Sequence, residues 1–106
     1  MGLNINLPSG MEVGAYADFA AVWHTPGAFV VDFIVAKQPP IPQIGQDGQP
    51  TGQQVFDGQV SARVRIPPEQ VTPIIKALTE QLRRWLDETG RSEPPEAWFP
   101  PSREND

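Results

Sequence analysis

The sequence predicts a single α+β domain, in which a four-stranded antiparallel β-meander is followed by one C-terminal amphipathic helix packed on one face of the sheet. Three observations lead to this prediction. Extended segments with alternating or β-branched and aromatic side chains recur as far as residue 66. Pro67 and Pro68 then prevent further pairing in a sheet. Beyond them, apolar residues follow at helical spacing.

The four predicted strands cover residues 3–7, 13–24, 28–36 and 59–66. The first, "LNINL", alternates apolar residues with asparagine, which is typical of a short, half-buried edge strand. Pro26-Gly27 supplies the turn between the second and third strands, because proline presets φ and glycine tolerates positive φ. The last, "QVSARVRI", has the plainest alternation, with valine, alanine and isoleucine pointing inward and its arginines outward.

Two other segments differ in composition from the strands. Residues 37–57, "KQPPIPQIGQDGQPTGQQVFD", are rich in Gln, Pro and Gly, so we expect a flexible loop that is either disordered or functional. Residues 91–106 form an acidic, Pro-rich tail with two Pro-Pro pairs. The predicted organisation is therefore one ββββα domain over 1–90 and a tail over 91–106.

The helix has two possible starting points. It begins at Pro68, with Pro73 inside it, or Thr72 caps it and Pro73 is its first residue. We favour the second, which makes "PPEQV" a separate turn. Glu80 and Arg84 are spaced to form an i,i+4 ion pair, and Gly90 is suited to end the helix.

One helix can cover only one face of this sheet. Apolar side chains line both faces of the hairpin, and Phe29, Val31 and Phe33 share one of them. Because large exposed apolar patches are uncommon on monomers, we expect a homodimer or higher oligomer. The long loop or the tail could cover the face instead. Trp98 and Phe99 in the tail are further candidates for protein contact, because aromatic residues often anchor interfaces.

Composition excludes several kinds of chemistry. The chain has 106 residues and no cysteine, so disulfides, thiolate metal sites and thiol nucleophiles are ruled out. We see no stretch long enough to span a membrane and no signal peptide, and the lack of cysteine fits the cytoplasm. No catalytic, cofactor-binding or metal-binding motif appears, so we do not expect an enzyme.

His24 and Asp32 are the residues around which an alternative function could be built. His24 is the only histidine, and with Asp18 or Asp32 it could line a pocket of a small-ligand-binding or enzymatic domain. The preferred interpretation is structural. Asp32 interrupts an apolar strand, and an unpaired buried carboxylate is costly, so we expect it to pair with Arg63 or Arg65 on the neighbouring strand.

A second alternative is nucleic-acid binding through the arginines. Arg63, Arg65, Arg83 and Arg84 could form a local basic patch. The net charge of −5 argues against it, and strand alternation and helix exposure explain these residues without a ligand. No nucleic acid and no membrane are therefore expected as partners.

Several short motifs resemble a known family: "YADFA" from Tyr16, "HTP" from His24, "FVVDF" from Phe29, an Arg-bearing strand, and Pro68-Glu69 before a Leu-rich helix. In this order they resemble domain of unknown function 3467, a family of small bacterial and archaeal proteins. The chain departs from that pattern in its longer Gln/Pro loop and in Pro67, where a Thr or Ser cap is expected. The resemblance implies no chemistry. The order of elements is also similar to that of SecB-type export chaperones, at the level of the fold alone.

These observations predict a protein-interaction module that acts as a homodimer, in an adaptor or chaperone-like role, and binds a further protein partner.

Overall fold

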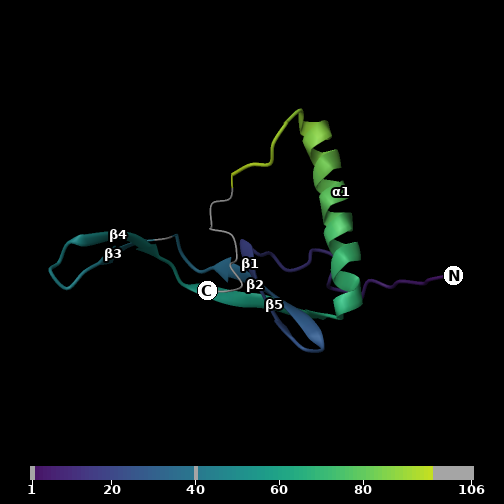
Figure 1. Cartoon of the computed structure of the whole chain (residues 1–106), viewed down its shortest axis with the longest axis horizontal. Coiled ribbons are helices and arrows are strands. Elements are labelled where there is room, and N and C mark those ends of the chain that lie inside the picture. Colours follow the sequence, from purple (N-terminus) through teal and green to yellow (C-terminus); the bar gives the residue numbers. More distant parts are fainter. Residues whose placement is uncertain (1, 40, 97–106) are drawn as a thin grey trace.

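The computed structural model describes residues 2–39 and 41–96. It contains two antiparallel sheets, one of three strands in the order β1-β2-β5 and one of two strands, β3-β4, and a single helix near the C-terminus (Figure 1). The elements are β1 (Phe19–Thr25), β2 (Ala28–Ala36), β3 (Ile41–Ile44), β4 (Pro50–Val55), β5 (Gly58–Ile66), the 3₁₀ turn η1 (Pro68–Gln70) and α1 (Val71–Thr89). The α+β class is confirmed, whereas the simple four-stranded meander is wrong.

The N-terminal segment is the first departure from the prediction. "LNINL" is not a strand, and the strand predicted from Val13 begins only at Phe19. Leu3 and Ile5 are 75% and 81% exposed, so the alternation meets no apolar surface on which to pack. A strand also needs a neighbour for its backbone groups, and none of the described strands pairs with this segment.

The three-stranded sheet has two distinct faces. Antiparallel pairing sets Ala21 and Arg63 on either side of Asp32, and Val22 and Val64 on either side of Val31. Because successive side chains of a strand point to opposite faces, these two rows lie on opposite sides of the sheet. We call the face with Val22, Val31 and Val64 the helix-side face, since the first turns of α1 lie over it, and the face with Asp32 the far face.

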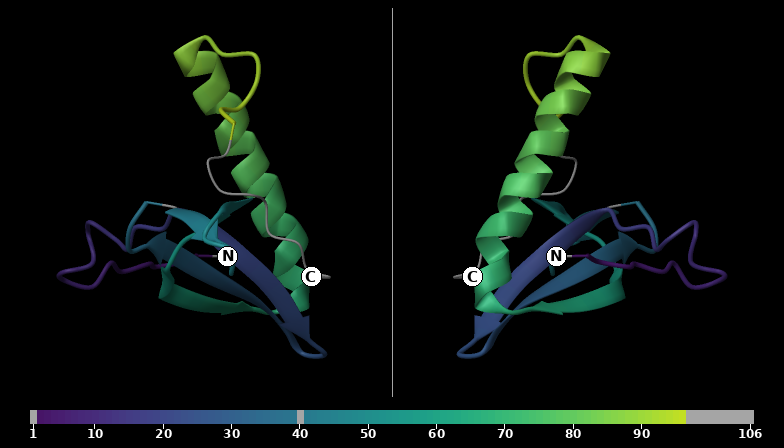
Figure 2. Two further views of the ribbon diagram at one scale, coloured as in Figure 1. Left: turned by 90° about the vertical axis from the view of Figure 1, so that its left-hand side faces the viewer. Right: turned by 90° about the vertical axis from the view of Figure 1, so that its right-hand side faces the viewer.

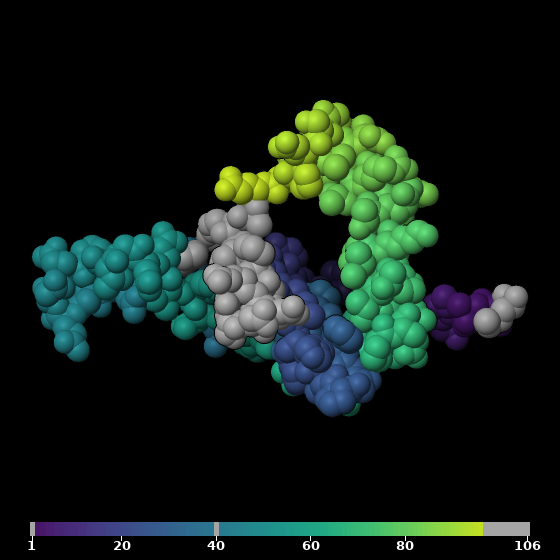
Figure 3. Space-filling view, viewed as in Figure 1, coloured from purple at the N-terminus to yellow at the C-terminus, as the bar shows by residue number. Residues whose placement is uncertain are grey.

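The segment predicted as an irregular loop contains a hairpin, the β3–β4 arm, which extends away from the sheet (Figures 1 and 3). Its turn is built on Asp47-Gly48: Gly48 has φ of 77°, and the Asp47 carboxylate accepts a hydrogen bond from the Gln49 N–H at 3.0 Å. Asp-Gly is the preferred chemistry of such turns. Two hydrogen bonds at the base and tip, Lys37 N–H to Asp57 O and Gly45 N–H to Gln49 O, complete the arm.

The helix α1 stands off the sheet and leans away from it over most of its length (Figure 2). The separate turn predicted before it is present as η1, but the helix begins at Val71 and not after a Thr72 cap. Pro73 lies in the first turn, where backbone N–H groups have no helical acceptor, so it costs no hydrogen bond. The predicted end at Gly90 is confirmed: its φ is 70°, and the Arg91 N–H donates to Leu86 O at 3.0 Å.

The fold buries very little apolar surface. Among the described residues, Ala28 and Val30 are the only hydrophobic ones that are buried. The chain exposes 9186 Å² and its radius of gyration is 17.9 Å. A compact monomer of this mass would expose about 5900 Å² with a radius of about 13 Å. The helix meets the sheet only through its base, so the predicted packing of a helix along one sheet face is incomplete in the single chain.

Candidate interaction surface

The far face is closed by a cluster of Trp23, Asp32 and Arg63, one residue from each strand. Asp32 is only 7% exposed. Its carboxylate accepts two hydrogen bonds from the Arg63 guanidinium, the one from Nη2 at 3.0 Å, and one from Trp23 Nε1 at 3.2 Å. The Arg63 guanidinium carbon also lies 5.5 Å from the centre of the Trp23 ring. The predicted pairing of Asp32 with an arginine of the neighbouring strand is confirmed, and the arginine is Arg63.

The electrostatics of this cluster indicate a structural role. The hydrogen bonds from Arg63 lower the pKa of Asp32, and they outweigh the desolvation that would raise it. The same contact raises the pKa of Arg63, so both groups are held in their charged forms. The carboxylate is occupied by three hydrogen-bond donors from Arg63 and Trp23, which favours a structural role over proton transfer.

His24 does not share a pocket with Asp32. The imidazole lies on the helix-side face, where it stacks on Phe29 with ring centres 5.5 Å apart. Asp32 projects from the far face. Asp18 accepts a hydrogen bond from the Ala36 N–H at 2.7 Å, beside the opposite end of β1. The acid–base or ligand site considered around His24 is therefore not assembled, and the described residues include no group of three or more possible metal ligands.

The arginines considered for nucleic-acid binding do not form a uniform basic patch. Arg83 pairs with Glu80 at 2.7 Å and with Asp87 at 3.1 Å, and Arg84 pairs with Glu80 at 3.3 Å. The predicted Glu80–Arg84 pair is thus confirmed. Since Arg63 is bound to Asp32, three of the four arginines face carboxylates within the chain.

The helix-side face forms an apolar groove with the base of α1. The groove has a volume of about 380 Å³ and is open to solvent. Among the described residues, all that line it are apolar: Ala20, Val22, Phe29, Val31, Phe33, Ile66, Val71, Ile74, Ile75 and Leu78. Phe29, Val31 and Phe33, the predicted interaction residues of the sheet, therefore share this groove. The other two, Trp98 and Phe99, lie outside the described residues.

The helix carries its own exposed apolar stripe, which we define as Val71, Ile74, Ile75, Leu78, Leu82, Trp85 and Leu86. Leu78 is 67% exposed and Ile75 57%, although both border the groove. Leu82 and Trp85 lie beyond the groove and are about 40% exposed. Stripe and groove form one continuous apolar surface.

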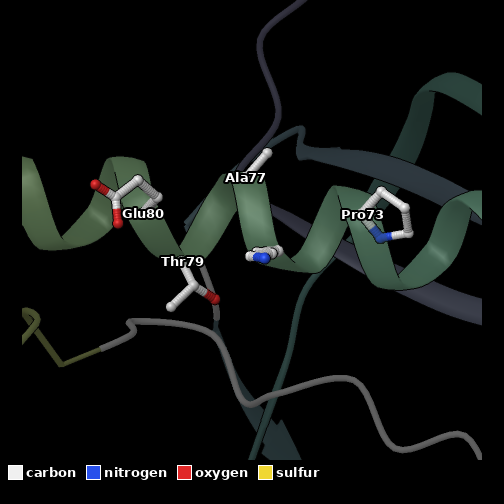
Figure 4. Close-up of a pocket in the computed structure, with 5 residues that line it drawn as sticks. Pro73, Ala77, Thr79 and Glu80 are labelled. Atoms are coloured by element: carbon white, nitrogen blue, oxygen red, sulfur yellow. The ribbon is translucent and has the colours of Figure 1, made fainter.

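Another side of the helix carries a second hollow, which has charged residues in its lining. A shallow hollow there is lined, among the described residues, by Pro73, Lys76, Ala77, Thr79 and Glu80, all from α1 (Figure 4). A single helix supplies this wall, and its ionic groups are exposed. The groove on the helix-side face is the better candidate for a functional surface.

Sequence reasoning found the aromatic row of β2 but missed the helix-side partners that complete the groove. Ala20 and Val22 come from β1, and Ile66 is the last residue of β5. The register of the strands brings them together: Val31 lies between Val22 and Val64, and Phe33 lies opposite Ala20.

The family follows from comparison with known proteins. The model of a family described as Protein of unknown function (DUF3467) matches residues 1–92. The chain belongs to this family. Neither a curated protein nor a solved structure matches it, so the similarity to SecB-type chaperones stays a prediction. Over the described residues, no helix combines the length and hydropathy needed to cross a membrane.

Proposed function

We propose that this member of the DUF3467 family is a protein-interaction module that acts as a homodimer through its helix-side face and helix stripe. The observation that carries the proposal is the exposed apolar surface formed by the groove and the stripe together. Phe33 and Val64 on the sheet and Leu78 on the helix are all more than one third exposed. A monomer with its largest apolar surface in water would forgo much of the free energy that folds a small domain.

A second copy of the chain is the partner that this surface fits best. The surface combines a flat sheet face with an amphipathic helix, and these two shapes complement each other when two copies face across a two-fold axis. The chain exposes about 3300 Å² more than a compact monomer of its mass. Two copies together carry about 6600 Å² of such excess, whereas obligate homodimers bury roughly 2000–5000 Å² in total, so a dimer interface would account for part of it.

An adaptor role follows more readily than a chaperone-like one. Self-association would cover the apolar face that a chaperone offers to unfolded clients. The β3–β4 arm lies away from that face and exposes Ile41, Ile44 and Val55. An isolated two-stranded hairpin is only marginally stable in water, so contact with a further protein would stabilise it. We place the second partner's binding surface on this arm.

Sedimentation equilibrium of the intact chain tests the dimer. We expect two copies per particle at micromolar concentration. Leu78→Asp places a charge in the interface and raises the dissociation constant about 100-fold. Val13→Asp is the matched control, since Val13 is an equally apolar, exposed residue outside the surface, and it leaves the constant unchanged within about twofold.

Two results would overturn the proposal. One is sedimentation of the intact chain as a monomer at high concentration, together with a circular dichroism spectrum that shows it to be folded. The other is a small apolar molecule found in the groove by native mass spectrometry, with Leu78→Asp and Phe33→Asp both abolishing its binding. The second result would assign the groove to a ligand and make the chain a binding protein of a different class.

A further inference from the structure

We infer that the two α1 helices pair in antiparallel orientation, with Leu78 at the two-fold axis, so that the outer half of each stripe covers the partner's helix-side face. This inference rests on the proposed homodimer and specifies its geometry. It is drawn from the spacing of the stripe, the angle of the helix to the sheet and the distribution of charge around the helix.

The spacing of the stripe is that of a helix seam. Val71, Ile75, Leu78, Leu82 and Trp85 follow one another at intervals of four, three, four and three residues. This is the heptad spacing by which two helices pack side by side. A helix packed on a sheet shows the same spacing, so the spacing alone does not select the occupant. The outer residues Leu82 and Trp85 do, because they lie beyond the groove of their own chain and are about 40% exposed. In the described chain α1 is the sole α-helix, and a second copy supplies another.

The helix diverges from the sheet along its length, and we call this divergence the wedge (Figure 2). The first turns of α1 line the groove together with the sheet. Toward its C-terminal end the helix moves away from the sheet (Figure 2). The outer half of the stripe, beyond Leu78, therefore cannot reach the helix-side face of its own chain. With 19 residues, α1 is about 28 Å long, and its outer turns extend well past the groove.

Antiparallel pairing would cover both exposed surfaces, the helix-side face and the outer half of the stripe, at the same time. It places Leu82 and Trp85 of one copy over Val22, Val31 and Phe33 of its partner, and the reverse. Parallel pairing would bring the outer halves of the two helices together and leave both sheet faces uncovered. The middle of the stripe, from Val71 to Trp85, is Leu78, so overlap of the two stripes is greatest when the axis passes through this residue.

The charged side chains of α1 lie outside the stripe. Thr72, Thr79 and Gln81 flank the stripe and are uncharged. The ion pairs of Glu80 with Arg83 and Arg84 lie on the side turned away from the stripe. Between Val71 and Leu82 two stripes can therefore meet without desolvating a charged group. At the outer end of the stripe, the Arg91 guanidinium carbon lies 5.3 Å from the centre of the Trp85 ring, so one cation borders the contact there.

Disulfide cross-linking of the intact chain tests the orientation, because the natural sequence holds no cysteine. We expect Leu78→Cys to form a homodisulfide at least tenfold faster than Ala77→Cys, which faces outward and is the control (Figure 4). An equimolar mixture of Ile75→Cys and Leu82→Cys should give mainly the mixed disulfide, since antiparallel pairing about Leu78 brings these positions together. Circular dichroism checks that each variant is folded.

The outcomes separate this inference from the proposed dimer. If Leu82→Cys links to itself and the mixture gives no mixed disulfide, the helices are parallel and the inference is wrong, although the dimer stands. If all variants sediment as dimers without any cross-link, α1 lies outside the interface and the inference is again wrong. If the unmodified chain sediments as a monomer, both the proposed homodimer and the inferred helix orientation are wrong.

Discussion

The two faces of the β1–β2–β5 sheet differ in how their side chains are covered. On the far face, Trp23 and Arg63 bind the Asp32 carboxylate, and Val30, which pairs with Trp23 in the sheet register, is 3% exposed. On the helix-side face, Val31 and Phe33 line a groove that the chain itself leaves open. Adjacent residues of β2 thus have different roles. Those on the far face pack within their own chain, and in the proposed dimer those on the helix-side face contact a second copy.

Removal of the Asp32 carboxylate should have the largest effect on the far face. Asp32→Ala leaves the Arg63 guanidinium and Trp23 Nε1 without their acceptor and loosens the contact among three strands. We expect a greater loss of unfolding free energy than from any other change proposed below, measured by urea denaturation. A double-mutant cycle with Arg63→Ala checks the cause, and strictly additive losses would show that the cluster is not cooperative.

Acid should weaken the far face in a graded way. The pKa of Asp32 is lowered in the folded chain, so its contribution to stability is present above the unfolded value of about 3.9. That contribution is lost as the pH falls from there through the folded pKa. Wild type should therefore lose more stability than Asp32→Asn between pH 5 and pH 2.

Glu80→Gln is the control for this titration. The pKa of Glu80 is lowered by Arg83, so this carboxylate contributes to acid sensitivity with the same sign. A wild-type pH profile parallel to that of Asp32→Asn would contradict a role for Asp32.

The neighbouring valines of β2 give the sharpest test of the difference between faces. Val30→Ala should lower the unfolding free energy by about 2 kcal/mol at every protein concentration, because it empties a buried site. Val31→Ala removes the same two methyl groups from the groove. Its effect should grow with protein concentration as dimers form, and equal, concentration-independent losses for both variants would show that the faces do not differ.

Replacement of the β3–β4 arm should have the smallest effect on either face. Residues 39–55 can be exchanged for a short Gly-Ser linker that keeps Lys37 and Asp57 close and retains Phe56, whose ring packs on Phe19 of β1 with ring centres 5.5 Å apart. We expect a change in sheet stability within about 1 kcal/mol, because loop-closure entropy varies slowly with loop length. A large loss, seen in thermal unfolding, would mean that the arm packs against the sheet in solution.

Sequence reasoning succeeded where a local pattern was sufficient. The alternation of β5 predicted a strand with outward arginines, and the lone carboxylate in β2 predicted Arg63 or Arg65 as its partner. Gly90 was identifiable as the end of the helix because only glycine adopts its backbone conformation at low cost.

Sequence reasoning failed where the structure depends on contacts between residues that are distant in the sequence. Leu3 and Ile5 alternate correctly but meet no strand that would make them part of a sheet. In the β3–β4 arm, the high content of glutamine and proline predicted a loop, although Asp47-Gly48 is a turn signal typical of a hairpin. The groove depends on the register of β1 against β2 and on the angle of α1, which no short pattern encodes.

The Pro67-Pro68 pair has a consequence for how the chain meets its partner. Pro67 holds φ at −65° and ψ at 146°, and the 3₁₀ turn follows at once, so the joint between sheet and helix is stiff. A stiff joint preorganises the wedge before any encounter. Association then loses little hinge entropy, and more of the contact free energy remains as affinity.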